Sequence, residues 1–111
     1  MRDVFDEAMR LMRSRNPQTQ EDGYHLLLSR AGDHVDELIE QFESETDHGL
    51  RCWLLELVGA ARAESALPLL GAQLGNPDDA LRDQAVRGLV LLDTREARRM
   101  LWRARANGII E

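Results

Sequence analysis

The sequence repeats itself with a period of thirty-one residues, and this period restricts the fold more than any other feature. Shifted by one period, Leu50-Arg51 falls on Leu81-Arg82, and Val58 falls on Leu89. Three copies share small or apolar residues in successive columns, which are Val35, Ala66 and Ala97, then Leu38, Leu69 and Met100, then Ile39, Leu70 and Leu101. Repeats of this length bury their apolar faces against one another, so the period predicts a stack of similar units.

Each copy is predicted to contain two helices, because its apolar residues recur at spacings of three, four and seven. No stretch of useful length alternates as a strand would. The predicted fold is therefore all-α, a short α-solenoid of about three antiparallel helix pairs preceded by an N-terminal capping helix. The expected helices run over 3–15 for the cap, over 17–30, 48–61 and 77–91 for the first helices, and over 34–44, 65–75 and 95–106 for the second.

A chain of 111 residues is expected to form one domain over 1–111. Its parts are the capping helix over 1–15, a degenerate repeat over 16–46, and two clearer repeats over 47–76 and 77–107.

Polar and glycine residues mark the expected helix ends. Asn16-Pro17 and Asn76-Pro77 each combine an N-cap with proline at the first helical position, and Asp33 and Thr94 are further expected N-caps. Gly108 is expected to end the last helix, with Ile109 and Ile110 folding back or reaching a partner.

Two stretches, DHGLRCWLLELVGAARAESALPLLGAQL and DDALRDQAVRGLVLLDTREARRMLWRA, resemble HEAT repeats of the short bacterial kind that is similar to the phycobilin-lyase-type repeat. The matching features are an aspartate four residues before an arginine, small and apolar residues through the first helix, and an Ala-x-x-Leu-Leu pattern in the second. The resemblance covers 47–106 and implies a helical interaction scaffold, since the family shares no catalytic residues that would carry over.

The aspartate and arginine pairs recur one period apart, which suggests a structural ladder. On a helix, residues four apart lie on one face, and each arginine is also expected to reach the neighbouring repeat. The predicted ladder consists of Asp47, Arg51, Asp78 and Arg82.

Charge is unevenly distributed along a chain whose net charge is −6. Residues 33–47 carry seven acids and no base, whereas residues 95–105 carry five arginines and one glutamate. The net charge argues against a nucleic-acid partner, because phosphate binding depends on clustered cations. With neither a membrane-spanning run nor a signal peptide in the sequence, we expect no membrane association and a cytoplasmic protein.

Chemistry-bearing residues do not form a recognisable catalytic, cofactor or metal site in the sequence. The histidines His25, His34 and His48 lack metal-ligand spacing, and no nucleophile triad, P-loop or dinucleotide fingerprint is present. Cys52 lies in an apolar helical run and is expected to be a buried small hydrophobe. We therefore predict no catalytic residues, no cofactor and no metal.

A candidate protein-binding surface is predicted on the second helices, which line the concave side of such a solenoid. Its outward positions change from acidic, through apolar, to basic with an aromatic. Gly71 is expected to leave a shallow dip beside Trp102, and Trp53 is expected to pack between repeats. The predicted surface consists of Asp36, Glu40, Glu43, Leu67, Gly71, Leu74, Arg98, Arg99, Trp102 and Arg105.

The function expected from these features is a non-catalytic protein-protein interaction module that binds a partner protein on its concave face. One alternative is an immunity-type inhibitor of a bacterial toxin, in which the acidic segment mimics nucleic acid. Another is a small lyase-like or nucleic-acid-acting HEAT-repeat enzyme subunit. The chain is expected to be a monomer or to associate weakly head to tail, since its first repeat is acidic and its last is basic.

Overall fold

The computed structural model describes residues 3–111, and within this range the chain is all-α, with seven α-helices and no strand. Short 3-10 turns at Ala31–Asp33 and Glu64–Ala66 precede the third and fifth helices. The helices are α1 (Val4–Met12), α2 (Pro17–Leu28), α3 (Val35–Ser44), α4 (His48–Ala60), α5 (Leu67–Gln73), α6 (Asp79–Leu92) and α7 (Arg95–Ala106). The predicted all-α class is confirmed, and each expected helix has a counterpart.

Side-chain caps fix where most helices begin. Asn16 accepts from the backbone N–H groups of Gln18 and Thr19, as predicted for the Asn16-Pro17 pair, and Thr94 accepts from that of Ala97. The prediction for Asn76-Pro77 was wrong, because α6 begins two residues later with Asp78 as its N-cap. Asn76 instead accepts from the backbone N–H of Asp78 in the preceding turn.

Asp33 is likewise not the N-cap of α3. It lies in the 3-10 turn that precedes this helix, and His34 occupies the cap position without a side-chain cap bond. The 3-10 turn therefore shifts the N-cap of α3 by one residue, from Asp33 to His34.

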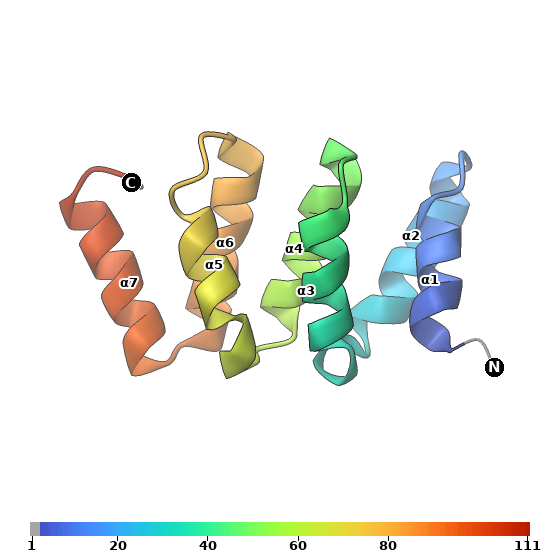
Figure 1. Cartoon of the computed structure of the whole chain (residues 1–111), viewed down its shortest axis with the longest axis horizontal. Coiled ribbons are helices and arrows are strands. Elements are labelled where there is room, and N and C mark those ends of the chain that lie inside the picture. The colour runs from blue at the N-terminus through green and yellow to red at the C-terminus, as the bar shows by residue number, and fades with distance from the viewer. Residues whose placement is uncertain (1–2) are drawn as a thin grey trace.

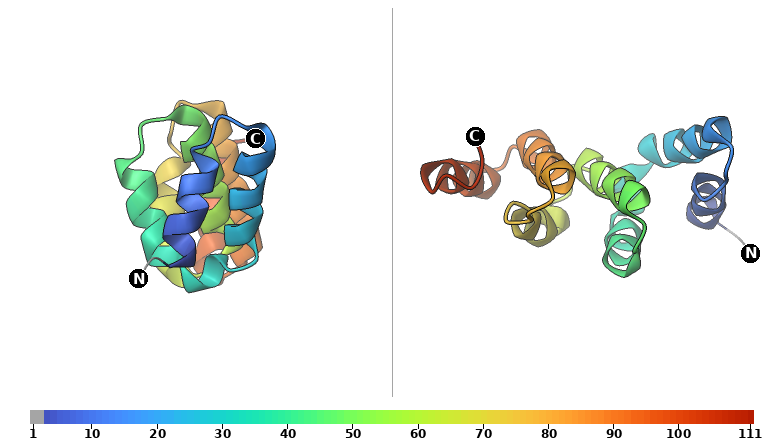
Figure 2. Two further views of the ribbon diagram at one scale, coloured as in Figure 1. Left: turned by 90° about the vertical axis from the view of Figure 1, so that its right-hand side faces the viewer. Right: turned by 90° about the horizontal axis from the view of Figure 1, so that it is seen from above.

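The helices lie side by side along a long axis, and the molecule measures 45 × 24 × 21 Å (Figure 1). Seen from above, α2, α4 and α6 form one row, and α1, α3 and α5 form a second row beside it, with α7 at the far end (Figure 2). The pairs α1–α2, α3–α4 and α5–α6 contact each other across the two rows. Contacts therefore run between near neighbours in the chain.

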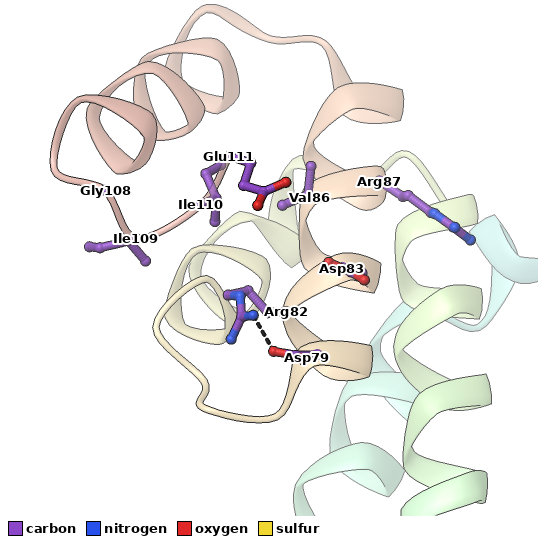
Figure 3. Close-up of a pocket in the computed structure, with 9 residues that line it drawn as sticks. All are labelled: Asp79, Arg82, Asp83, Val86, Arg87, Gly108, Ile109, Ile110 and Glu111. Atoms are coloured by element: carbon purple, nitrogen blue, oxygen red, sulfur yellow. Dashed lines mark hydrogen bonds and ion pairs between the residues drawn. The ribbon is translucent and has the colours of Figure 1, made fainter.

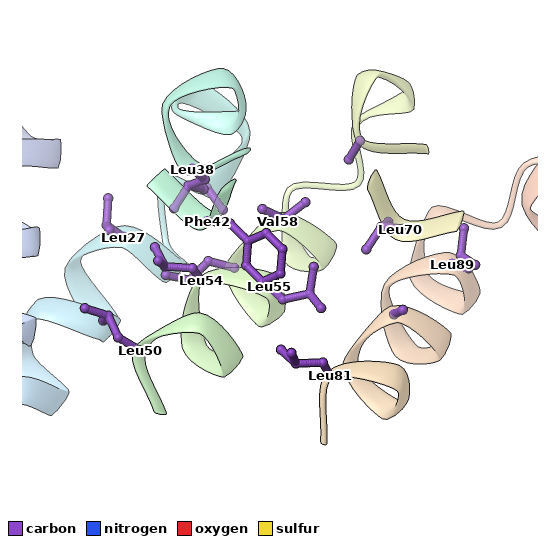
Figure 4. Close-up of a cluster of buried hydrophobic side chains, with 14 of the residues drawn as sticks. Leu27, Leu38, Phe42, Leu50, Leu54, Leu55, Val58, Leu70, Leu81 and Leu89 are labelled. Atoms are coloured by element: carbon purple, nitrogen blue, oxygen red, sulfur yellow. The ribbon is translucent and has the colours of Figure 1, made fainter. Parts of the chain in front are cut away.

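The core lies between the two rows (Figure 4). Leu38 and Phe42 of α3 pack with Leu54, Leu55 and Val58 of α4, all essentially inaccessible to solvent. Leu27 extends this core towards α2, and Leu70 and Leu89 extend it towards α5 and α6. Burying a side chain of this size contributes about 1.5–3 kcal/mol, so these positions supply much of the stability.

A close helix contact joins α4 and α6 through two glycines. A Cβ atom at Gly59 would lie 2.8 Å from the Cα of Gly88, and one at Gly88 would lie 3.1 Å from the Cα of Gly59 and 2.9 Å from Leu70. No side chain could shift to relieve the backbone contact. The two residues therefore set the distance between the central helices of the first row.

The predicted ladder residues have structural roles, but the expected aspartate–arginine pairing was wrong. Asp47 and Asp78 are N-caps, accepting from the backbone N–H groups of Leu50 and Leu81. Their carboxylates are thus directed at the helix ends, and the ion-pair partner of Asp78 is His48, at 2.7 Å.

The two arginines of the predicted ladder bind backbone carbonyls instead. Arg51 donates to the carbonyls of Phe42 and Glu45 at 3.1 and 3.0 Å, and its guanidinium lies 4.1 Å from the centre of the Phe42 ring. Arg82 donates to the carbonyl of Asn76 at 3.0 Å and pairs with Asp79. Each arginine therefore joins the beginning of one helix to the chain that enters it.

The α1–α2 hairpin is tied to α3 and α4 partly by a buried carboxylate. Glu45 accepts from Arg13 at 2.6 Å, from Gln41 at 3.3 Å and from the backbone N–H of Asp47 at 3.1 Å. Burial alone would raise the pKa of Glu45, but the hydrogen bonds from Arg13 and Asp47 and the charge of Arg13 lower this pKa overall. The folded state therefore favours the ionised carboxylate.

We predict that Gly59→Ala lowers the free energy of unfolding by up to about 2 kcal/mol, because overpacking costs about 1–3 kcal/mol and better helix propensity returns about 1. Gly49→Ala is the matched control on the same helix, where a Cβ would meet nothing closer than 3.6 Å. The control should be neutral or slightly stabilising. Urea unfolding measures both, and a Gly59→Ala protein as stable as the control would contradict the close-contact interpretation.

The Glu45 site predicts a pH dependence. Because the folded state lowers this pKa, the stabilisation is present at neutral pH and is lost as pH falls through the folded value, below the ordinary 4.5. Glu45→Gln should cost about 1–2 kcal/mol at pH 7, as expected for charged hydrogen bonds, and progressively less in acid. Chemical unfolding across this pH range tests it, with exposed Glu43→Gln as control. A constant difference between Glu45→Gln and the native protein would oppose the assignment.

Candidate protein-binding surface

The outward residues of α3 and α7 are exposed. Asp36, Glu40 and Glu43 lie on the solvent side of α3, and Arg98, Arg99, Trp102 and Arg105 lie on the solvent side of α7. Trp102 is 69% exposed, the highest value among the large apolar side chains with substantial exposure. The two ends of the predicted surface are therefore accessible.

The centre of the predicted surface differs from expectation. Leu67 is half-buried, and Leu74 is only 6% exposed and belongs to the core, so the outward placement of Leu74 was wrong. The side chain over Gly71 is that of Met100, whose Sδ would lie 3.0 Å from a Cβ at Gly71. Trp102 lies two residues on, about 200° around α7, and faces away from this contact. The expected dip beside Trp102 is therefore filled by Met100.

A groove does run between α5 and α7, and it has a volume of about 540 Å³. Its α5 side is uncharged, and its α7 side contains one charged residue, Arg103. The lining residues are Pro68, Gly71, Ala72, Leu74, Gly75, Met100, Arg103, Ala104, Asn107 and Ile109.

Two further grooves separate the preceding helices of the same row. The groove between α1 and α3 includes the carboxylates Asp6, Glu37 and Glu40, while the groove between α3 and α5 includes Glu43 and Arg51. Charge along the row therefore changes from acidic at α1–α3, through mixed, to basic at α5–α7. The predicted gradient has a counterpart in the grooves, although several of the lining residues differ from those predicted.

The arginines of α7 differ in their partners. Arg98 pairs with Asp93 at 2.9 Å, Arg99 lies 3.7 Å from Glu96, and Arg105 donates to the backbone oxygen of Glu111 at 3.1 Å. The side chains of Arg95 and Arg103 have no ion-pair or hydrogen-bond partner among residues 3–111. Their charge is available to a molecule that binds this helix.

Sequence reasoning missed part of the exposed apolar surface. Besides Trp102, the large apolar side chains with substantial exposure include Val90 and Leu91 of α6 and Ile109 beyond α7. The signal was present in the run GLVLL at 88–92, which holds more apolar residues than one buried helix face needs. Exposed apolar surface is thus concentrated at the C-terminal end of the described structure.

The residues after α7 fold back beside α6 (Figure 3). Gly108 adopts a positive φ of 73°, and the backbone N–H of Ile109 donates to the carbonyl of Ala104 at 2.9 Å, which ends the helix as expected. Ile110 is half-buried against the core, while Ile109 is 48% exposed. A cleft of about 560 Å³ lies between this segment and α6, with Arg82 and Asp79 paired at its edge.

The cysteine and a histidine lie close together, but not as a nucleophile and its base. Nε2 of His48 is 2.7 Å from Asp78 and 3.8 Å from the Sγ of Cys52, so one ring nitrogen faces both groups. A catalytic triad requires the two nitrogens to serve separate partners. Burial, together with the charge of Asp78, raises the pKa of the Cys52 thiol, which further disfavours the reactive thiolate.

The residues that the structure describes contain neither a cluster suited to a metal ion nor a membrane-spanning helix. Within residues 3–111, no group of three or more histidine, cysteine, aspartate or glutamate side chains is arranged to hold a metal ion. No helix of the described chain is both long and apolar enough to cross a membrane.

Trp53 of α4 packs against the neighbouring helix α2 and is half-buried. Its ring centre lies 5.1 Å from that of Tyr24, and the hydroxyl of Tyr24 donates to Glu56. Burial, this hydrogen bond and the charge of Glu56 all raise the pKa of Tyr24. Tyr24 and Glu56 thereby join α2 to α4.

Tyr24 is the single tyrosine of the chain, so its ionisation can be followed directly by ultraviolet absorbance. We predict a titration midpoint well above the ordinary value of about 10, and a lower midpoint in Glu56→Gln. Exposed Glu64→Gln serves as control and should leave the midpoint unchanged. Ionisation near the ordinary value in the folded native protein would be incompatible with the Tyr24–Glu56 contact.

Searches of protein-family models, curated proteins and solved structures found no match to this chain.

Proposed function

We propose that the protein is a non-catalytic protein-protein interaction module, built as a short HEAT-like solenoid and binding a partner protein through the row of α3, α5 and α7. The solenoid interpretation is supported by the period of thirty-one residues and by the arrangement of successive helices in two rows. The helices that contact each other across the rows, α1–α2, α3–α4 and α5–α6, are nevertheless offset by one helix from the predicted pairs. The repeated arginines Arg51 and Arg82, each bound to the carbonyls of the preceding turn, are consistent with repeated units.

The observation that carries the proposal is the concentration of exposed apolar side chains and arginines at one end. Trp102 and Ile109 belong to α7 and the segment that follows, whereas Val90 and Leu91 add exposed apolar surface on α6, in the other row. Tryptophan and arginine are the residue types most enriched at binding hot spots, and exposed apolar surface marks interaction sites. The basic end would supply affinity, and the acidic groups of α3 would orient the partner.

An immunity-type inhibitor is a more specific form of the same proposal. It is favoured by the exposed carboxylates Asp36, Glu40 and Glu43, which would face a basic toxin. The acidic segment is nevertheless less available than its composition indicates, because Glu45 is buried against Arg13 and Asp47 caps α4. The broader interaction module is therefore the function we favour.

The proposal predicts loss of a partner on mutation of α7. Tagged native protein should capture a defined partner from its own cells, and Trp102→Ala with Arg98→Glu should reduce recovery at least about tenfold, because both side chains are exposed binding residues. The matched control is Leu28→Ala with Arg30→Glu, an exposed leucine and arginine at the end of α2.

The control protein should capture the partner as the native protein does, and circular dichroism should show that all three proteins are folded. Failure of the native protein to retain any protein beyond the tag alone would refute the proposed function. Equal loss in the α7 variant and the control would show that the substitutions act through stability.

A further inference from the structure

The α5–α7 groove is lined largely by small residues. Gly71, Ala72 and Gly75 supply its α5 side, and Ala104 supplies part of its α7 side. The groove between α3 and α5 is instead lined on its α3 side by larger side chains, including Ile39 and Phe42. Because α5 contributes so little volume, the neighbouring Pro68 and Met100 remain open to a bound molecule.

The charge of the groove has one sign. Arg103 is exposed on its wall and has no partner among residues 3–111, and the lining contains no carboxylate. The α5 strip is neutral throughout, since no charged residue occurs from Ala66 to Pro77. Arg99, one turn before Arg103, adds a second positive charge whose nearest acid, Glu96, is 3.7 Å away. Negative charge on a bound molecule would thus be attracted without competition from the groove itself.

A second copy of the chain is a poor occupant of this groove. In a symmetric dimer the two subunits contact each other through the same surface, so Arg103 of each subunit would face the basic helix α7 of the other. Such like-charge contacts oppose association. A head-to-tail contact would instead bring the acidic α3 of a second copy to the groove, but the apolar residues Leu38 and Phe42 of that helix are already buried in its own core. The complementary occupant is therefore an acidic segment with a free apolar face, which comes from a different protein.

The length of α5 limits how much of a partner the groove can hold. Its seven residues extend over about 10 Å, or about two helical turns. Helices that bind in grooves present apolar side chains at positions three and four apart, which suits a strip of this length. The groove volume of about 540 Å³ is within the range of about 300–1,000 Å³ that is common for binding sites.

We propose that the groove between α5 and α7 binds a short acidic amphipathic helix of a partner protein, with its apolar side chains over Ala72 and Gly75 and its carboxylates on Arg103 and Arg99. This inference rests on the proposed interaction function and specifies the site and the partner's chemistry. Met100, unbranched and flexible, lies across the groove floor and adapts to the side chains that enter.

The test begins with selection of a displayed random peptide library on the native protein. The enriched peptides should be acidic, with apolar residues three or four apart. Fluorescence anisotropy then compares one labelled enriched peptide on the native protein and on the groove variants Ala72→Trp and Arg103→Glu. Both variants should bind at least about tenfold more weakly, the first by filling the groove and the second by reversing its charge.

Two controls match these substitutions in kind. Ala80→Trp places the same side chain on an exposed alanine of α6, and Arg95→Glu reverses an unpartnered arginine of α7 that lies outside the groove. Both controls should bind the peptide as the native protein does. All four positions are exposed, so the variants are expected to fold, as circular dichroism would verify.

The inference is overturned by any of three results: no enrichment, enrichment of neutral or basic peptides, or binding that both groove variants leave unchanged. Capture of a partner from the protein's own cells distinguishes failure of the groove inference from failure of the proposed function. A partner retained by both the native protein and Ala72→Trp would refute the groove assignment alone. No partner on the native protein would refute the proposed function itself.

Discussion

The contact between Gly59 and Gly88 is the constraint on which the rest of the structure depends. It brings α4 and α6 to backbone contact, and Leu70 of α5 packs directly over it. With these helices so close, Leu55, Val58 and Leu89 fill the space between the rows without large voids. The position of α5, and hence the width of the groove between α5 and α7, follows from this contact.

The sequence was sufficient to predict the helices and most of the buried positions, because both depend on apolar spacing within a single unit. It could not predict which polar groups would meet. Asp47 and Asp78 have the right spacing to pair with Arg51 and Arg82, but a carboxylate at a helix start is closer to unbonded N–H groups than to the arginine. Local hydrogen bonding therefore prevailed over the side-chain pairing.

The candidate site was predictable in its chemistry but not in its geometry. Translation by one period correctly placed exposed acids on α3 and exposed arginines on α7. It failed at Leu74, which is buried, and at the dip expected beside Trp102, which Met100 fills. Translation along the sequence assumes that every second helix has the same length and packing, whereas α5 has only seven residues and lies against Met100 of α7.

The attachment of the α1–α2 hairpin has a consequence for local unfolding. Its ties to α3 and α4 include the pair between exposed Arg13 and buried Glu45 and the Tyr24–Glu56 hydrogen bond, whereas α4 and α6 meet through backbone and an apolar core. The contact of α2 with α4 is also much smaller than the contact of α4 with α6. Amide protons of α1 and α2 should thus exchange through a partial opening, while those of α4 and α6 require global unfolding, which makes the α1–α2 hairpin a separate cooperative unit.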